Sequence, residues 1–194
     1  MQLRRVISIA TPVILSVTPL YAAEFVITPG QPNQVVFTSK ATTETFQGKT
    51  DRMTGRIDLD PASIGDSVAV HIEVDLASLD TGIGKRNQTM RNDYLETKKY
   101  PTAVFDGATL VSGGGRALAA DPAFEVEGTF SLHGVTHRMR ATVDVTQKDA
   151  HTLEFKAAFK VPLADYNITR PKFLFLKLGE VQEVEVTGTA VAAP

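Results

Sequence analysis

Apolar and polar residues alternate along most of the chain, which is the pattern of strands with one buried and one exposed face. In segment 68–76 every second residue is apolar, and most residues between them are polar or charged. Segments 124–132 and 153–161 repeat this pattern, with phenylalanines on the apolar face. The chain is therefore predicted to hold about eight or nine strands. Weaker alternation marks the stretches 35–37, 57–59, 103–105, 139–145, 173–178 and 184–190.

One stretch does not alternate and is read as a short helix. Residues 85–99 are mostly polar, and Met90, Tyr94 and Leu95 are spaced to form an apolar stripe on a helix. The Tyr-Pro pair at 100–101 is expected to end it. Short strands at regular spacing, without repeated helical crossovers, predict an all-β fold: an antiparallel barrel or sandwich in one domain.

The first residues have the organisation of a secretory signal peptide. Arg4 and Arg5 precede an apolar stretch that ends before Ala22 and Ala23. That stretch contains prolines and is shorter than the ~20 residues that a membrane-spanning helix needs. We expect a signal peptide at 1–23, cleavage near Ala23 and a mature domain at 24–194. Such a protein would be periplasmic or secreted, without stable insertion into a membrane.

The amino-acid composition excludes cysteine-based sites and argues against nucleic acid as a partner. The 194 residues include no cysteine, which excludes a disulfide framework, a thiolate metal site and a cysteine nucleophile. The formal net charge is -2 and no long basic run occurs, so nucleic acid is not an expected partner. A chain of 194 residues, of which 43% are hydrophobic, is long enough and apolar enough to bury a core.

Candidate catalytic and metal-binding residues are weak. His133 and His137 are four residues apart, which in a strand means ~13 Å, too far for two ligands of one zinc ion. We interpret them as exposed imidazoles at a hairpin turn, and His71 and His151 as exposed. No nucleophile elbow occurs, and no serine or threonine has a recognisable base at a familiar spacing. The sequence therefore predicts no catalytic and no metal-binding residues.

The inward positions leave two interpretations open. An eight-stranded barrel is either just filled by its side chains or holds one small ligand. Gly128, Ala157, Gly188 and Ala190 are small, and no tryptophan is present to fill the centre, so an apolar tunnel is one reading. A tapering barrel with a filled core is the other, because small and large residues also alternate there.

Three groups of motifs resemble one family of proteins. The hairpin segment 128–136 is similar to the pattern G-x-L-x-L-H-G-V-T, and segment 159–168 to F-x-V-x-L-x-D-Y-G-I. Asn167 stands where the second pattern usually has glycine, and asparagine tolerates the left-handed backbone that such a turn needs. The third group lies at Leu79-Asp80-Thr81-Gly82, Arg86-Asn87, Met90-Arg91, Tyr94-Leu95, Lys99-Tyr100-Pro101 and Phe105.

Taken in their order along the chain, the motifs resemble the YceI family of lipocalin-like proteins, from about Phe25 to Val191. The resemblance implies an extended antiparallel eight-stranded lipocalin-like barrel with one short helix. It also implies that the interior binds and carries or sequesters a long-chain isoprenoid lipid, either a polyisoprenoid or an isoprenoid quinone. No other cofactor is implied, and the resemblance suggests a homodimer.

Two sets of residues are predicted to contact such a ligand. At the rim, an arginine is expected to bind a quinone carbonyl or a phosphate headgroup, and a tyrosine to keep its hydroxyl in water. The rim set is Arg86, Met90, Arg91, Tyr94 and Tyr166. The interior set is Val70, Ile72, Val74, Phe105, Phe124, Val126, Gly128, Phe130, Phe155, Ala157, Phe159, Val184 and Val186.

Two alternatives to a lipid carrier follow from the same observations. One is an enzyme that acts on an isoprenoid or another apolar substrate, with the rim arginines and a histidine such as His133 as its working groups. The other is a stress-protective β-domain with a filled core and no ligand. The carrier interpretation depends on an interior that is not filled.

Overall fold

The computed structural model describes residues 23–41, 44–65, 67–112, 115, 117–118, 123–173 and 176–193. The predicted signal peptide, apart from Ala23, lies outside these residues. Among the described residues, no helix is long and apolar enough to cross a bilayer.

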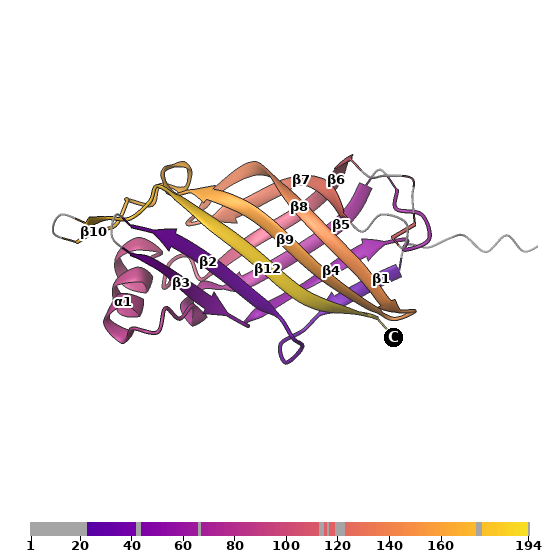
Figure 1. Ribbon diagram of the computed structural model, residues 1–194, viewed down its shortest axis with the longest axis horizontal. Helices are drawn as coiled ribbons and strands as arrows, with labels where there is room; N and C mark the ends of the chain where they lie inside the picture. Colours follow the sequence, from indigo (N-terminus) through magenta and orange to yellow (C-terminus); the bar gives the residue numbers. More distant parts are fainter. Residues whose placement is uncertain are drawn as a thin grey trace, which may run out of the picture.

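Eight antiparallel strands close into a barrel, as predicted (Figure 1). The barrel closes where the last strand pairs with the first, with Phe25 opposite Ala192 and Val26 opposite Val191. In order round the barrel, the strands are β1 (Ala23–Ile27), β4 (Met53–Leu59), β5 (Ser67–Asp75), β6 (Thr102–Ser112), β7 (Ala123–Leu132), β8 (Val135–Asp149), β9 (Thr152–Pro162) and β12 (Val181–Ala192).

A hairpin outside the ring of eight strands extends one end of the barrel. Its strands are β2 (Gln34–Lys40) and β3 (Thr45–Thr50). Residues 183–187 of β12 pair with β2, whereas the end of β12 pairs with β1. β2 and β1 therefore lie one after the other along the same edge of β12. In Figure 1 the β2–β3 hairpin continues the wall towards the helical end of the molecule.

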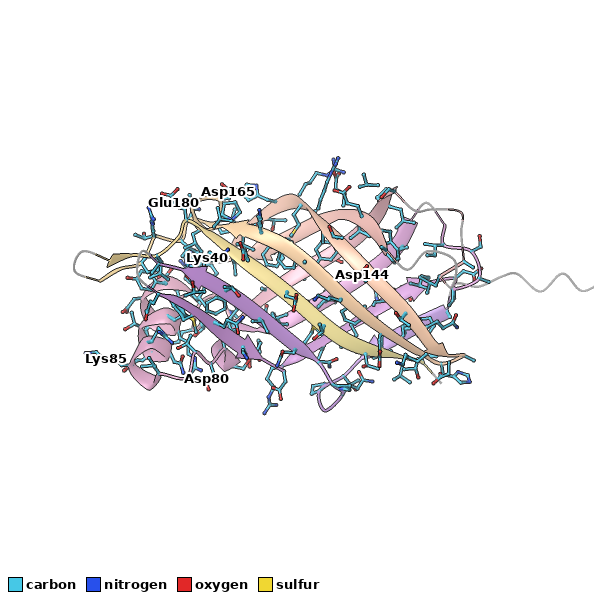
Figure 2. All side chains as sticks on the ribbon, in the orientation of Figure 1. Lys40, Asp80, Lys85, Asp144, Asp165 and Glu180 are labelled. Carbon is cyan, nitrogen blue, oxygen red and sulfur yellow. The ribbon has the colours of Figure 1, made fainter. Side chains whose placement is uncertain are left out.

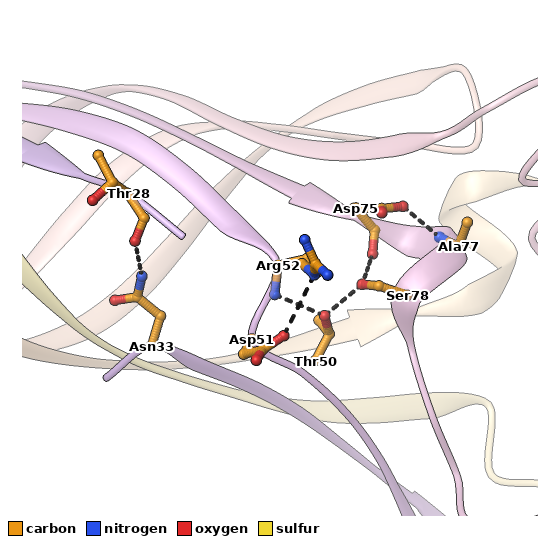
Figure 3. Close-up of polar contacts among 8 residues, drawn as sticks. All are labelled: Thr28, Asn33, Thr50, Asp51, Arg52, Asp75, Ala77 and Ser78. Carbon is orange, nitrogen blue, oxygen red and sulfur yellow. Dashed lines mark hydrogen bonds and ion pairs between the residues drawn. The ribbon is translucent and has the colours of Figure 1, made fainter. Parts of the chain in front are cut away.

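Side-chain hydrogen bonds hold the points where the wall is interrupted (Figure 3). Between β1 and β2, Asn33 Nδ2 donates to Thr28 O at 2.9 Å, and Asn33 Oδ1 accepts from the backbone of Thr189 at 3.2 Å. Between β3 and β4, the hydroxyl of Thr50 accepts from the backbone of Arg52 at 2.9 Å. The interruptions are therefore specific structures in which backbone and side-chain groups are satisfied.

A helical segment connects β5 to β6 and covers the side of β3 that no strand covers. It consists of η1 (Leu76–Ser78), α1 (Gly84–Thr89) and η2 (Met90–Tyr94). Backbone hydrogen bonds of 2.8 Å in both directions join Lys49 of β3 to Asp80. The short helix predicted between 85 and 99 is confirmed, and it ends before Glu96, whose φ is +45°.

Two shorter features complete the fold. The turn η3 (Leu163–Tyr166) ends at Asn167, whose φ of +55° is the left-handed conformation expected at this position. A small separate hairpin, β10 (Lys172–Phe173) and β11 (Leu176–Lys177), stands where one strand was predicted over 173–178.

The barrel interior contains two clusters of buried side chains. The first fills the half of the barrel around β1, where Phe25, Ile27, Met53 and Leu153 are at most 1% exposed. The second lies towards the helical segment and includes residues such as Phe130 from the barrel strands. One half of the interior is therefore packed, as in the filled-core interpretation.

Candidate functional site

The other half of the interior holds a cavity of about 580 Å³. Its walls come from the barrel strands and from the β2–β3 hairpin, and the helical segment closes one side. Both interpretations of the interior are thus partly right, because the barrel is filled at one end and hollow at the other.

The cavity lining divides the predicted residues into two groups. Five interior positions line it, namely Val74, Phe130, Phe159, Val184 and Val186. Three rim residues also line it, namely Arg86, Met90 and Tyr94. The remaining predicted positions are not part of this lining: Val70, Ile72, Phe105, Phe124, Val126, Gly128, Phe155, Ala157, Arg91 and Tyr166.

Most interior positions outside the lining belong to the packed half. Phe124, Val126 and Phe155 are buried there, and Ala157 packs against the same cluster. The small residues also leave no tunnel in that half. A side chain at Gly128 would overlap the ring of Phe105, and one at Gly188 would lie 2.5 Å from Phe155 Cζ.

Several lining residues were not predicted. Leu132 and Val161 share the apolar faces of β7 and β9 with predicted residues, so the alternation already contained the signal for them. Leu76 continues the apolar face of segment 68–76, so the alternation contained its signal as well. Leu79 lies outside regular strands, and Phe46 lies in β3, where alternation is weak. The path of the chain around the open side of the barrel brings these two to the cavity.

Arg86 holds the helical segment against β3. Its guanidinium lies 4.1 Å from the ring centre of Phe46, and its Nη1 lies 3.8 Å from Glu44 Oε1. Nε donates to the hydroxyl of Thr81 at 2.9 Å, and Nη2 donates to the backbone oxygen of Thr81 at 2.8 Å. The prediction of a guanidinium open to a headgroup needs correction, because Arg86 already has partners inside the protein.

Arg91 has a similar internal role. Its Nη2 donates to the backbone oxygen of Leu79 at 2.7 Å. This contact fixes the loop between η1 and α1 from the helix side. Arg91 thus supports the cavity wall without lining it.

The same loop is held by a network around Asp80 and Asn87. Asn87 Oδ1 accepts from both the backbone and the hydroxyl of Thr81, at 2.8 and 2.7 Å. Asn87 Nδ2 donates to Asp80 Oδ1 at 2.6 Å, and the backbone of Gly82 donates to the same oxygen at 2.8 Å. These hydrogen bonds to the charged carboxylate hold the pKa of Asp80 below its ordinary value of 3.8.

Tyr166 and His133 lie close together beside the cavity wall. Tyr166 is 4% exposed, and burial raises the pKa of its hydroxyl, so it does not keep that group in water at the mouth. His133 occupies the two-residue turn between β7 and β8 but is largely buried, which corrects the expectation of an exposed imidazole. Its ring nitrogens lie 2.9 Å from Glu96 Oε2 and 3.0 Å from Tyr166 O.

The chemistry of the cavity is that of an apolar binding site. Its walls are mostly aliphatic and aromatic, and its charged lining residues, Glu44, Lys85 and Arg86, come from the hairpin loop and α1. None of the four histidines lines it. Within the described residues, no group of three histidine, aspartate or glutamate side chains is placed to hold a metal ion. An extended apolar molecule fits such walls, with any polar end towards the charged residues.

A closed antiparallel barrel with an apolar cavity at one end is a lipocalin-like architecture. The chain belongs to the YceI family: the model of the YceI-like domain matches residues 25–191. A UPF0312 protein of Vibrio cholerae is 34% identical over 92 residues, which are 47% of this chain and 45% of that protein. The chain thus matches about half the length of this curated relative.

Solved structures share the fold at low sequence identity. A polyisoprenoid binding domain from Saccharophagus degradans, implicated in plant cell wall breakdown, has a TM-score of 0.66 and 19% identity, and the match covers 89% of this chain and 99% of that one. BcnA of Burkholderia cenocepacia has a TM-score of 0.65 and 20% identity, covering 84% and 96%. A YceI protein of Campylobacter jejuni has a TM-score of 0.64 and 16% identity, covering 79% and 88%.

Proposed function

We propose that this protein binds and carries a long-chain isoprenoid lipid in the hollow half of its barrel, without transforming it. The observation that carries the proposal is the apolar cavity of about 580 Å³ beneath the helical segment. Membership of the YceI family and the likeness to a polyisoprenoid binding domain support it. A polyisoprenoid and the tail of an isoprenoid quinone are both ligands of this class.

Burial of apolar surface would supply most of the binding free energy. The volume falls within the range of ~300–1,000 Å³ that is usual for small-molecule sites. Each methylene-sized group moved from water into the cavity contributes about 0.8 kcal/mol, before the cost of ordering the chain. We propose that the tail lies between Phe130, Phe159 and Val184, with the polar end near Lys85 and Thr89.

A carrier of this kind also fits the expected processing of the chain. We propose that residues 1–23 are removed near Ala23 and that the domain at 24–194 works in the periplasm or outside the cell. Assembly as a homodimer remains a prediction from the family resemblance. The cavity walls are mostly aliphatic and aromatic, which suits the binding of an apolar ligand.

Filling the cavity tests the proposal directly. Ala103 is 6% exposed and lines the cavity, so in Ala103→Phe the added ring would enter the hollow space. We expect the affinity for a detergent-solubilised isoprenoid quinone to fall at least about tenfold, which corresponds to ~1.4 kcal/mol. Val184→Phe, a change at another lining residue, provides a second test if the first variant folds poorly.

The matched control is Ala158→Phe, because Ala158 is an exposed residue of β9. Binding is measured by fluorescence titration, and mass spectrometry of a solvent extract identifies any lipid that the purified protein already holds. Equal binding by the cavity variants and the control would contradict the proposed site. A protein that neither contains nor takes up an isoprenoid would contradict the carrier function and favour the domain without a ligand.

A further inference from the structure

Among the described residues, three that are not glycine have a left-handed backbone, and each of them lies next to the cavity. They are Glu96, His133 and Asn167, with φ values of +45°, +52° and +55°. Each is adjacent in sequence to a residue that lines the cavity, namely Leu95, Leu132 and Ile168. This backbone conformation is unfavourable for residues other than glycine and is concentrated at functional sites. Its concentration here indicates a specific structure at the hollow end of the barrel.

The imidazole of His133 joins the other two positions. Its Nε2 lies 2.9 Å from Glu96 Oε2, just after the helical segment, and its Nδ1 lies 3.0 Å from Tyr166 O, next to Asn167. The ring centres of His133 and Tyr100 are 4.6 Å apart, and the His133 side chain is only 10% exposed. The contacts of this ring with Glu96 and Tyr166, here named the His133 link, connect two segments that are distant in sequence.

The backbone of the β7–β8 turn does not explain the histidine. His133 and Gly134 form a two-residue turn in which both φ values are positive, and asparagine followed by glycine suits that turn best. An added Cβ at Gly134 would lie 2.6 Å from Tyr100 Cε1, so the glycine also gives room to that ring. Histidine differs from asparagine in having a ring that reaches both partners. The residue at this position is therefore explained by its side-chain contacts.

Only a protonated imidazole satisfies both contacts of the His133 link. A backbone oxygen and an ionised carboxylate are both acceptors, and a neutral imidazole carries hydrogen on one nitrogen only. Without the second proton, one bare nitrogen faces an oxygen that has lone pairs of its own. The link is therefore complete at low pH, and it weakens as the pH rises through the range of about 5–8 in which histidine side chains titrate.

The other charged and titratable groups around the ring come from three elements. In the segment after η2, Lys99 Nζ lies over the ring of Tyr100, 4.8 Å from its centre. In η3, Asp165 contributes a backbone oxygen, and burial raises the pKa of Tyr166, so its hydroxyl does not titrate in this range. In β8, the exposed His137 packs against the Tyr166 ring, and its Nε2 lies 2.8 Å from Asp165 O. His137 is the one group here that an experiment must separate from the link.

The two segments joined by the link form opposite walls of the cavity. Figure 2 shows Asp165 of η3 and Asp80 of the helical segment at the same end of the molecule but on opposite sides of it. The ring of Tyr166 packs edge-on against Phe130 at 5.6 Å, and Phe130 packs against Phe159 at 5.5 Å. Phe130 and Phe159 line the cavity. Loss of the link would therefore loosen η3 and the end of the helical segment together.

We propose that protonated His133 is a positioning residue that holds the hollow end of the barrel closed, and that its deprotonation speeds the entry and release of the bound molecule. His133 acts through Glu96 and Tyr166, because it does not itself line the cavity. The proposal rests on the proposed function, since it concerns regulation of the same cavity. A closing contact of this kind changes the rates of entry and release by similar factors, so the affinity changes much less.

Release of a bound isoprenoid quinone tests this regulation. The loaded protein is mixed with an excess of detergent micelles, and transfer of the quinone is followed at about pH 5.5 and about pH 8. We expect release to be about fivefold faster at the higher pH, which corresponds to ~1 kcal/mol for a contact with one half-exposed partner. The dissociation constant should change much less than the release rate.

Two variants separate the proton from the contact. His133→Asn removes the ring but keeps a residue that suits the left-handed turn, so release should be fast at both pH values. Glu96→Gln keeps the contact without a second proton, because an amide can either accept from Nε2 or donate to it. Its release should be slow at both pH values. The matched control is His137→Asn, which removes the neighbouring exposed histidine and should keep the full response to pH.

Amide exchange tests the His133 link without a ligand. In the ligand-free protein, residues 95–100 should exchange faster at about pH 8 than at about pH 5.5, after correction for the intrinsic pH dependence, and Glu96→Gln should remove that difference. A pH response that persists in His133→Asn, or that is lost in His137→Asn, would overturn the proposal. Equal exchange at both pH values would overturn it as well. A protein that takes up no isoprenoid would contradict the carrier function, whereas exchange would still decide whether the link responds to pH.

Discussion

At three positions of the sheet, a phenylalanine ring occupies the space beside a glycine. Phe37 lies over Gly48, and Phe105 lies over Gly128. Phe155 lies over Gly188, where an added Cβ would be 2.5 Å from the ring and 2.9 Å from the end of Met53. The absence of a glycine side chain lets each ring lie close against the backbone of a neighbouring strand. The glycines thus contribute to dense packing and not to open space.

This packing predicts that Gly188→Ala destabilises the protein. Its added methyl group must displace Phe155 or Met53 inside the packed half, and overpacking of this kind costs about 1–3 kcal/mol. The free energy of unfolding, measured by urea denaturation, should fall by that amount. The control is Gly84→Ala, because no atom lies within 4 Å of the added Cβ and alanine favours a helix. Equal stability of the two variants would contradict this account.

The same glycines show which packing contacts the alternation pattern cannot predict at the scale of single residues. Alternation correctly predicts that Gly128 and Gly188 lie on apolar faces of their strands. It does not indicate which neighbouring side chain reaches over them. A small residue predicts a void only when its neighbours are also short, and that depends on the register between strands distant in sequence.

At the scale of elements, the helical segment covers the one edge of β3 that no strand pairs with. β3 pairs with β2 only, and an unpaired edge is open to further pairing. Backbone bonds from Lys49 to Asp80 cover this edge, and the network of Asp80, Thr81 and Asn87 orients α1 above it. The hydroxyl chain from Thr50 through Ser78 to the backbone oxygen of Asp75 holds η1 in place (Figure 3).

This network predicts that the helical segment loosens in acid. The pKa of Asp80 is lower in the folded protein, chiefly because Asn87 donates to it, and secondly because Gly82 does. A depressed carboxylate pKa adds stability above the unfolded value of 3.8, and that stability is lost as the pH falls through the lower folded pKa. Amide exchange in residues 79–95, corrected for its intrinsic pH dependence, should therefore accelerate below about pH 4.

The variant Asp80→Asn tests the cause of that loosening. It cannot gain or lose the proton, so exchange in residues 79–95 should be faster at neutral pH and should change less in acid. Asp51→Asn serves as the control, because Asp51 is exposed, with its side chain 81% accessible. An unchanged acid response in Asp80→Asn would show that another group is responsible.

The sequence predicts most barrel strands correctly but gives no clear signal for β1 and β3. β5, β7 and β9 alternate over at least nine residues and were placed within one residue of their ends. β1 has five residues, and β3 contains Phe46 as its one large apolar side chain, so neither produces a clear periodic signal. Both are strands because long-range pairing with β12, β4 and β2 imposes it.

At the scale of the whole molecule, the barrel divides its interior between stability and binding. The packed half, with Phe25 and Leu153 fully buried, closes the barrel through the pairing of β1 with β12. The hollow half is bounded by β2, β3 and the helical segment, where strand pairing is interrupted. A protein that holds an apolar ligand needs both, because the packed half must supply the stability that an empty cavity does not.

This division explains why the site was only partly predictable. Phe130, Phe159 and Val184 line the cavity, because alternation identifies inward positions along a strand, and their contact with a ligand stays a prediction. Alternation does not indicate how far along the barrel the packing stops. That boundary lies where β1 gives way to β2 and where the chain leaves β5 for the helical segment, and both follow from the three-dimensional path of the chain.

The two halves should therefore differ in stability when no ligand is bound. Segments with few buried contacts open locally at lower free energy than a packed core. In the lipid-free protein, amides of the helical segment and of β3 should exchange faster than amides in the middle of β9 and β12.

An isoprenoid at about 100 times its dissociation constant stabilises the bound form by ~2.7 kcal/mol. Its addition should slow exchange mainly in the helical segment and β3, measured by hydrogen exchange with mass spectrometry. The variant Ala103→Phe should slow exchange there without the ligand, because its ring fills the same space. Uniform exchange in the lipid-free protein, or equal slowing in both halves, would show that the cavity is not a separate region of lower stability.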